Sequence, residues 1–153
     1  MEKPTKTAMQ LLERKQRSGA IAVAPDSTVL AALKTLADHD IGAVLVLQGD
    51  RLVGILSERD CVRKVELAGR AAAGVQVRDI MTSKVLSVRP DQTARECRKI
   101  MGDARIRHLP VVDGGRVVGV LSSKDILDEV IAEDERVIQQ LETERLVTMT
   151  GNY

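Results

Sequence analysis

The sequence predicts an α+β fold in which one β-α-β-β-α unit occurs twice, the two copies being related by a pseudo-twofold axis, with an N-terminal helix and a long C-terminal helix. Three observations support this prediction. The chain contains an ungapped internal repeat, its apolar residues change from helical to strand patterning within each copy, and an apolar stripe continues past the second copy.

The repeat aligns residues 21–65 with residues 86–130, and 16 of the 45 aligned positions are identical. Chance would give about three identities at ordinary residue frequencies, so the duplication is real. The clearest copies are "VGILSERD", which ends at Asp60, and "VGVLSSKD", which ends at Asp125. A single copy is too short to bury an adequate core, so we expect the two copies to share one.

Helical spacing predicts a leading helix within residues 4–18, with Met9, Leu11 and Leu12 on its apolar face. A short extended stretch then opens each copy. This stretch is "AIAV" at residues 20–23 and "KVLSV" at residues 84–88.

A helix is predicted next in each copy, after a Pro-Asp pair. In the first copy its apolar positions follow helical spacing at Val29, Leu30, Leu33, Leu36 and Ala37. Asp26 is the expected cap of this helix, and Asp91 or the Thr93-x-x-Glu96 pair is the expected cap of its counterpart.

Two strands joined by a turn follow each of these helices. "AVLVL" and "RLVGIL" are connected through "QGD" in the first copy, and "LPVV" and "RVVGVL" through "DGG" in the second. Further helices are expected to begin near Glu58 and near Ser123. The predicted segments are a helical segment at 1–18, motif 1 at 19–66, a linker at 67–77, motif 2 at 78–130 and a helical extension with a tail at 131–153.

The last helix carries apolar residues well beyond the repeat. They are Ile126, Leu127, Val130, Ile131, Val137, Ile138 and Leu141. A stripe that outlasts its own domain requires a partner, most simply a second copy of the chain, so a homodimer is predicted.

Composition narrows the class of protein. The chain is 44% hydrophobic and 29% charged with a net charge of +1, which indicates a globular protein without a strong field toward nucleic acid or a membrane. Its apolar runs are too short to span a bilayer, and "MEKPTKTAMQ" has no secretory h-region. Two cysteines fit reduced thiols better than a disulfide framework, so we expect a cytoplasmic location.

Residue chemistry in the two copied stretches suits a sugar. Ser57 and Ser122 fall at a strand-to-helix turn, where a hydroxyl can cap the helix or meet an anion. Asp60 and Asp125 lie one turn further, where a carboxylate can accept both ribose hydroxyls. The structural alternative is that each Ser caps its helix and each Asp complements the helix dipole.

Cations near these positions can serve a phosphate. Arg59 and Lys124 directly precede the two aspartates. Arg105, Arg107 and His108 stand at the entry to a strand of the second copy, which is the more basic of the two. The alternative is that these side chains are solvated surface, and that His108 covers the strand end. Neither histidine has neighbours at metal-ligand spacing, so no metal site is predicted.

Taken together, "IGAVLVLQGDRLVGILSERD", "DIMTSKVLSVRPDQT" and "RIRHLPVVDGGRVVGVLSSKDIL" resemble tandem CBS (cystathionine-β-synthase) motifs, the pair also called a Bateman module. The resemblance covers roughly residues 12 to 130. It implies a stand-alone regulatory module without catalytic machinery, frequent dimerisation, and clefts between the motifs that bind adenosine-containing ligands such as AMP, ADP, ATP, NAD(H) or S-adenosylmethionine.

The resemblance also implies where the base lies. It places adenine against the strand that opens each motif, at Gly19 and Ala20 in the first and at Lys84 and Val85 in the second. Ile41 and Ile106 line the facing wall. Aliphatic clamping suits a chain whose only aromatic residue is Tyr153.

Pro110 matches the family's pattern only in the second motif, because Leu45 stands at that position in the first. The first motif departs from the pattern again at Gly42 and Ala43. Occupancy of its cleft is therefore the less secure expectation.

Three other function classes remain open at this point. An adaptor dimer with empty clefts would use mainly the long final helix. An enzyme is disfavoured because Cys61 and Cys97 lie in predicted helices without a paired histidine. Nucleic-acid binding is disfavoured because no basic stripe with interleaved aromatics exists. With no effector domain in this sequence, a sensor must act through an unidentified partner protein.

Overall fold

The computed structural model describes residues 6–15 and 21–150, so Gly19 and Ala20 lie outside the described residues. The chain divides into two compact units, each of which joins segments that are distant in sequence. The helical unit takes its described residues from Met1–Arg17, Val88–Leu109 and Leu121–Tyr153. The sheet unit takes its described residues from Ser18–Ser87 and Pro110–Val120.

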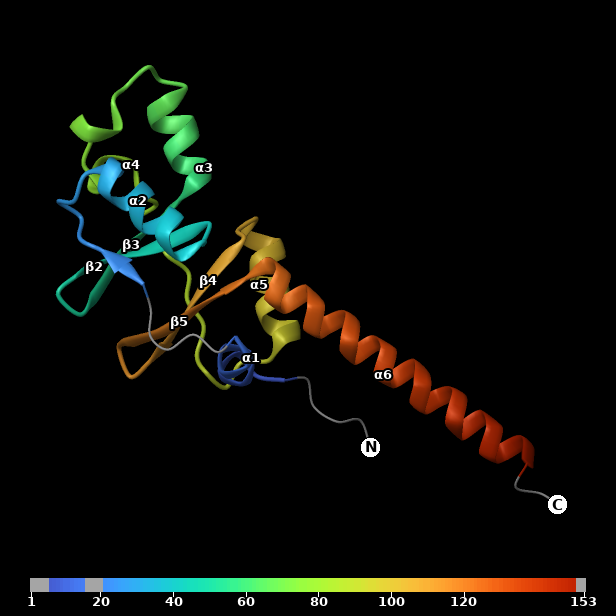
Figure 1. The fold of residues 1–153 in the computed structure, drawn as a ribbon. Helices are drawn as coiled ribbons and strands as arrows, with labels where there is room; N and C mark the ends of the chain where they lie inside the picture. The colour runs from blue at the N-terminus through green and yellow to red at the C-terminus, as the bar shows by residue number, and fades with distance from the viewer. Residues whose placement is uncertain (1–5, 16–20, 151–153) are drawn as a thin grey trace. The chain divides into compact units, whose positions relative to one another are not determined.

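A three-stranded sheet organises the sheet unit (Figure 1). Its order is β1 (Ala22–Val23), β2 (Ala43–Gln48) and β3 (Arg51–Ser57), with β1 parallel to β2 and β2 antiparallel to β3. The helices are α2 (Val29–His39), α3 (Glu58–Cys61), which continues as a π-helical turn (Val62–Glu66), and α4 (Val77–Ile80); a 3₁₀ turn (Ala72–Gly74) precedes α4. The predicted order of elements in the first motif is confirmed.

One face of α2 supplies much of this unit's core. Val29, Ala32 and Leu36 are buried against apolar residues of β2, β3 and the segment 61–80. Leu30 is 38% exposed and Ala37 is exposed, so the predicted apolar face was too wide.

Helix capping in both copies uses threonine. The Oγ1 of Thr28 accepts the amide of Ala31 at 3.1 Å, so the expectation that Asp26 caps α2 was wrong. Thr93 caps α5 (Ala94–Ala104) by accepting the amide of Glu96 at 3.2 Å, which selects one of the two predicted alternatives. The short threonine side chain lies directly at the first turn, whereas the aspartates lie two residues earlier.

The turns between paired strands are confirmed at glycines. β4 (His108–Asp113) and β5 (Arg116–Ser122) are joined by Gly114 and Gly115, whose φ values are 56° and 82°. Gly49 between β2 and β3 has φ 63°. These left-handed conformations are the ones that tight hairpin turns demand and that glycine adopts without strain.

Three helices form most of the helical unit. α1 (Ala8–Arg14) is shorter than the predicted 4–18 segment and begins with Thr7 as its cap. Backbone hydrogen bonds tie it to the start of α5, from the Ala8 amide to the Gln92 carbonyl at 2.8 Å and from the Ala94 amide to the Lys6 carbonyl at 2.9 Å. The N-terminal helix α1 therefore packs with the second motif, although the first motif follows it in the sequence.

The extended stretch expected at residues 84–88 does not form a strand, since only Val88 makes an isolated bridge. Ser87 stands where the first motif has Ala22, and it is exposed. It offers no apolar side chain to secure a second paired residue.

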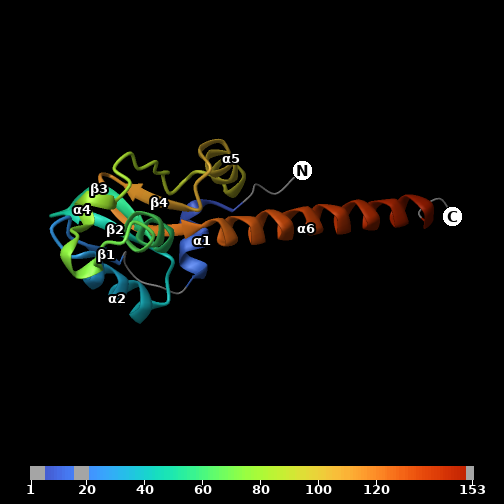
Figure 2. The same cartoon turned by 90° about the horizontal axis from the view of Figure 1, so that it is seen from above.

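α6 (Ser123–Thr150) is the long final helix that the sequence predicts. Figure 2 shows it continuing as a single rod beyond α1 and α5 of its own unit. Every residue from 138 to 147 is exposed. Within residues 6–15 and 21–150, no helix combines the length and the apolar character that crossing a membrane requires.

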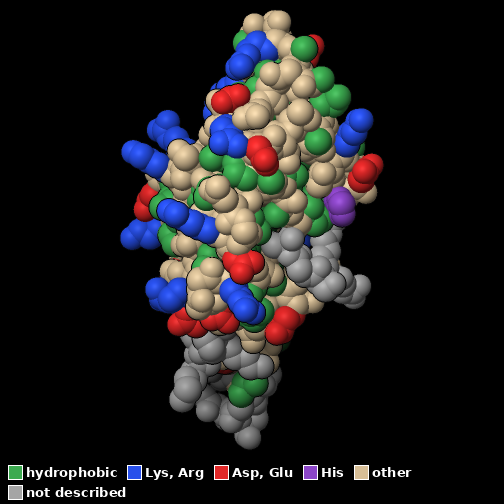
Figure 3. All heavy atoms as spheres, turned by 90° about the vertical axis from the view of Figure 1, so that its left-hand side faces the viewer, with side chains coloured by type: hydrophobic (Ala, Val, Ile, Leu, Met, Phe, Trp, Pro, Cys, Tyr) green, Lys and Arg blue, Asp and Glu red, His purple; other side chains and the backbone are tan. Residues whose placement is uncertain are grey.

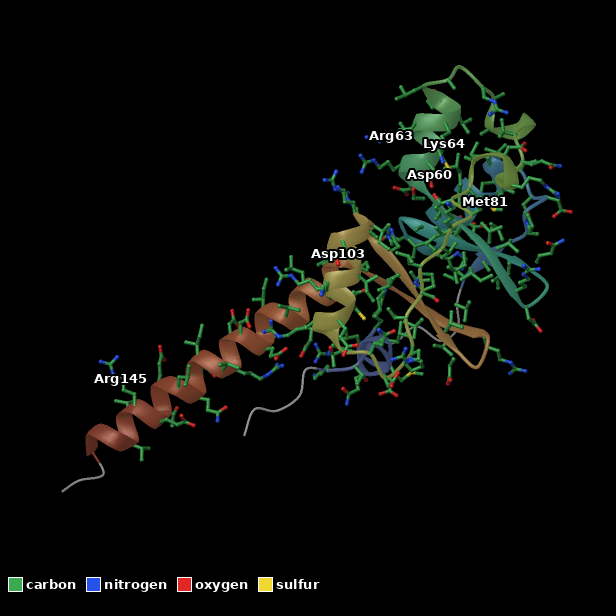
Figure 4. All side chains as sticks on the ribbon, turned by 180° about the vertical axis from the view of Figure 1, so that it is seen from behind. Asp60, Arg63, Lys64, Met81, Asp103 and Arg145 are labelled. Atoms are coloured by element: carbon green, nitrogen blue, oxygen red, sulfur yellow. The ribbon has the colours of Figure 1, made fainter. Side chains whose placement is uncertain are left out.

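Gly54 in β3 has a structural explanation. A Cβ at this position would lie 2.5 Å from the Sδ of Met81 and 3.1 Å from the carbonyl oxygen of Thr82. The segment is held there because Ile55 and Thr82 exchange backbone hydrogen bonds of 3.0 and 2.9 Å. Figure 4 shows Met81 beside the sheet. Close approach of the chain, with no ligand involved, is sufficient reason for this glycine.

We therefore expect Gly54→Ala to lower the free energy of unfolding by about 1–3 kcal/mol, because the new methyl group overpacks against Met81 and Thr82. Urea denaturation measures the change. Gly102→Ala is the matched control: a Cβ there meets nothing within 4 Å, and the α5 helix should gain about 0.5–1 kcal/mol. Equal midpoints for the two variants would contradict the explanation.

Candidate ligand-binding site

The repeated Ser-x-x-Asp sequence folds into the same reciprocal cap in both motifs. In the second motif, the Asp125 amide donates to Ser122 Oγ at 3.2 Å, and the Ser122 amide donates to Asp125 Oδ2 at 2.8 Å. In the first motif, the corresponding distances between Asp60 and Ser57 are 3.1 and 3.3 Å. The capping alternative is therefore confirmed for both serines.

A second amide at each helix start is also satisfied. The Ser123 amide donates to the Arg107 carbonyl at 2.8 Å, and the Glu58 amide donates to the Gly42 carbonyl at 3.0 Å at the equivalent place. These bonds leave less of the helix start for an anion than the sequence suggested. The chemistry available to a ligand is instead concentrated on the aspartates.

The contacts of Asp125 converge on one of its oxygens. Oδ2 receives the Ser122 amide, the Ser122 hydroxyl at 2.9 Å and the Lys15 ammonium at 2.8 Å. Among the described residues, no donor reaches Oδ1. The side chain is 23% exposed, so the carboxylate is fixed at one oxygen and open at the other.

Electrostatics keep Asp125 ionised. Burial opposes its ionisation, but the hydrogen bonds from Lys15 and from the Ser122 amide and hydroxyl outweigh burial and lower the pKa of the carboxyl. The group is a permanent acceptor at neutral pH.

Asp60 obtains its cation from its own helix. The Lys64 ammonium lies 3.5 Å from Asp60 Oδ1 and 2.9 Å from the carbonyl oxygen of Ile80. Figure 4 shows Asp60 and Lys64 on successive turns of the same helix. Both oxygens of Asp60 therefore have a partner, in contrast to Asp125.

One of the positions at which the two motifs differ is Lys64 in the first and Glu129 in the second. Glu129 is fully buried, and its carboxylate meets Arg14 at 3.0 Å and Arg136 at 2.7 Å. Because this position in the second motif is acidic, the cation for Asp125 is instead Lys15, which caps the C-terminal end of α1. The N-terminal helix is thus a component of the second site.

His108 lies in the same electrostatic environment. Burial lowers the pKa of its imidazole, the positive charges of Lys15 and Arg107 lower it further, and Asp125 opposes them. His108 is consequently neutral at neutral pH, where it can act as a hydrogen-bond donor or acceptor but not as a charged phosphate ligand.

The remaining predicted residues fall in both units. Ile106 is half-buried and Arg107 and Lys124 are exposed in the helical unit. The sheet unit holds buried Pro110, half-buried Ile41 and Val85, and exposed Arg59 and Lys84. The ligand contacts predicted for all of these residues, and for Ser57, Asp60, Ser122 and Asp125, stay predictions.

Sequence reasoning missed Lys15, Lys64, Arg14 and Glu129. Lys64 was readable, because it lies four residues after Asp60 on a predicted helix. Glu129 carried a weaker signal, as a charge between the apolar positions Ile126 and Val130. Nothing local marked Lys15, whose partner is 110 positions away in the sequence.

The described residues give little support for a cysteine nucleophile, a metal site or a basic surface. Burial raises the pKa of the Cys61 and Cys97 thiols to about 11, so both stay protonated at neutral pH. No group of three or more metal-ligating side chains occurs within residues 6–15 and 21–150. On the face seen in Figure 3, basic and acidic side chains are interspersed.

The family model for the CBS domain matches residues 6–67 and 77–132. The chain belongs to the CBS-domain family, as its repeated fold and paired caps indicated. It is 36% identical over 121 residues to the CBS domain-containing protein CBSX3, mitochondrial, of Arabidopsis thaliana, covering 76% of this chain and 59% of that protein. This chain thus spans about three fifths of that relative.

Solved structures agree on the fold. A putative signal-transduction protein with CBS domains from Burkholderia ambifaria is 40% identical, with a TM-score of 0.76 over 83% of this chain and 95% of that one. The CBS domain pair of protein MJ0100, in complex with 5′-methylthioadenosine and S-adenosyl-L-methionine, is 24% identical, with a TM-score of 0.71 over 82% of this chain and 95% of that one.

The buried carboxylate gives a stability prediction. Replacing Arg14 and Arg136 together by Met should cost about 3–5 kcal/mol, because a buried charge is left unpaired. Adding Glu129→Met should restore most of this loss, because no charge then remains buried. Denaturant titration of the double and triple variants measures both effects. A triple variant that is less stable than the double would contradict this account.

His108 gives a pH prediction. Because its pKa in the folded state is lowered, the unfolded chain binds the proton first, and stability is lost as pH falls below the ordinary histidine value of about 6.5. The loss ends once the folded-state pKa is passed. His108→Gln should flatten thermal midpoints between about pH 7 and pH 5 relative to the parent chain. Parallel curves for the two proteins would remove His108 as the cause.

Proposed function

We propose that this chain is a non-catalytic regulatory module that binds an adenosine-containing ligand and relays its occupancy to a partner protein. The observation that carries the proposal is the Asp125 carboxylate, which is ionised and fixed through Oδ2 while Oδ1 meets no donor among the described residues. An oriented carboxylate with an open oxygen suits the vicinal hydroxyls of ribose.

Support for adenosine comes from two directions. The bound molecules named for the MJ0100 structure share adenosine and differ in the substituent at the 5′ carbon. A site that recognises their common part must read the purine and the ribose. Within its helical unit, this chain offers Asp125 for ribose and half-buried Ile106 for a purine.

Two cations near Asp125 and His108 can serve a negatively charged 5′ substituent of the ligand. Lys15 is paired with Asp125, and Arg107 precedes β4, where its charge acts on the neighbouring His108. AMP, ADP, ATP and NAD(H) therefore stand beside S-adenosylmethionine as candidates. Of the two motifs, the second carries the stronger proposal, because Lys64 already occupies the second oxygen of Asp60.

Ligand occupancy is relayed to the partner protein by a shift in population between two arrangements of the module. A ligand can bias two arrangements of the module only by the difference in its affinity for them. The output of this shift is a change in the surface offered to a partner protein. We propose that the module also self-associates as a homodimer.

A second candidate function is that of an adaptor that works through α6. Its supporting observation is the exposed end of that helix at residues 138–147. The two functions separate in thermal melts with AMP, ATP, NADH and S-adenosylmethionine. A ligand at 100 times its dissociation constant should add about 2.7 kcal/mol. If none of the four ligands raises the melting temperature, the adaptor function is favoured over ligand binding.

Asp125→Asn tests the ribose assignment. Loss of the charged acceptor should weaken binding of the responding ligand by more than about tenfold, since a hydrogen bond to a charged group contributes about 1.5–3 kcal/mol. Calorimetry should be run with the ligand and its 2′-deoxy analogue. The parent chain should discriminate between them, and the variant should not.

Asp128→Asn is the control, because this exposed carboxylate lies on the same helix outside the cap. Its affinity should match that of the parent chain. Unchanged affinity and discrimination in Asp125→Asn, with helical content preserved by circular dichroism, would refute the ribose role.

A further inference from the structure

The exposed side of α6 carries a heptad pattern. Four large apolar residues lie on this side, namely Leu127, Ile131, Ile138 and Leu141, each between 47% and 59% exposed. Leu146 and Val147 are also exposed on α6, at 61% and 62%, but fall outside this spacing. Asp134 and Arg145 complete the spacing, which then alternates four and three residues from 127 to 145. This alternation is the seam of a two-helix coiled coil, with polar residues at two of its six positions.

The end of α6 is not supported by its own unit. All ten residues from 138 to 147 are exposed, and Figures 1 and 2 both show this end beyond α1 and α5. This end continues a 28-residue helix whose first turns are packed, so its helical form can propagate from them. Its apolar side chains Ile138 and Leu141 nevertheless remain uncovered by their own unit.

We propose that the seam from Ile131 to Arg145 is covered by α6 of a second copy, running antiparallel. In this register Ile138 lies opposite the partner's Leu141, and Asp134 lies opposite the partner's Arg145. Both pairs are centred on the same point, between Gln139 and Gln140, so one twofold axis generates each contact twice. The seam is complementary to itself, which makes a second copy the occupant.

Charge decides between the two directions. A parallel pair would set Asp134 against Asp134 and Arg145 against Arg145, which places like charges in two layers. The antiparallel pair turns both layers into ion pairs. Arg145 forms no ion pair with any described residue, and Figure 4 shows it projecting from the far part of α6. Asp134 contacts Arg95 but its side chain stays 57% exposed, so it remains accessible.

One feature opposes the pairing. Glu135 and Glu142 border the seam on one side, and in the antiparallel register they approach each other across it. This like-charge contact weakens the association, and it identifies Glu142→Gln as a variant that should tighten it. The pairing specifies the surface for the self-association proposed above and is independent of ligand binding.

Spin labels test direction and register together. Single cysteines at Gln139 and Asp128, which share one side of α6, react first because Cys61 and Cys97 are buried. With 1.5 Å rise per residue and helix axes about 8–10 Å apart, labels should lie about 10–20 Å apart at position 139 and about 35 Å apart at position 128. Pulsed electron paramagnetic resonance on the full chain measures both distances.

Each outcome decides the proposal. Short distances at both positions would show a parallel pair and overturn it. A dimer by sedimentation without a short distance at position 139 would place self-association on another surface and also overturn it. A monomer at the labelled concentration would remove self-association altogether. Ligand melts on the same samples report separately on nucleotide binding.

A charge exchange supplies the matched variants. Arg145→Glu should raise the dissociation constant of the pair at least about tenfold, because it repels Asp134 in two layers. Adding Asp134→Arg should recover most of the affinity, since the two charges are exchanged. Glu142→Gln should lower the dissociation constant. Failure of the exchange to recover affinity, with both variants folded, would overturn the antiparallel register.

Discussion

The carboxylate of Glu129 is fully buried, and the arrangement of the helical unit follows from the need to neutralise it. An unpaired charge in that position would cost several kcal/mol, so α6 requires cations from outside its own buried face. Arg136 supplies one from the next turns of α6, and Arg14 supplies the other from α1. The N-terminal helix is thereby held on the second motif, although it precedes the first in sequence.

Because α1 is held there, the Lys15 ammonium lies beside Asp125, so the charge around this carboxylate depends on the docking of the N-terminal helix. The ammonium helps to lower the pKa of the carboxyl and occupies only Oδ2. In the first motif, the lysine at the position of Glu129 serves the equivalent aspartate from within the same helix. The exchange of charge at this position therefore accompanies a different source of the cation for each aspartate. One site is self-contained, and the other depends on a separate helix.

Local patterns were sufficient to predict most elements of the fold, and they offered the Ser-x-x-Asp caps as one of two alternatives. The repeat, the glycine turns and the stripe of α6 each depend on residues that are close in sequence. Errors arose where packing or a distant partner decided the outcome. Leu30 and Ala37 are exposed because the sheet covers a narrower face of α2 than the spacing allowed, and residues 84–88 lack the pairing of their counterparts. Lys15 could not be assigned, because its role exists only once α1 is docked.

The docking of α1 joins residues that are 115 positions apart, and this separation has a consequence for synthesis. The ribosome produces α1 first and Glu129 long afterwards. Between these events nearly all of the sheet unit has emerged and can acquire its core. Completion of the helical unit must await the last helix, so a nascent chain halted after residue 87 carries a leading helix whose counter-charges have yet to be translated.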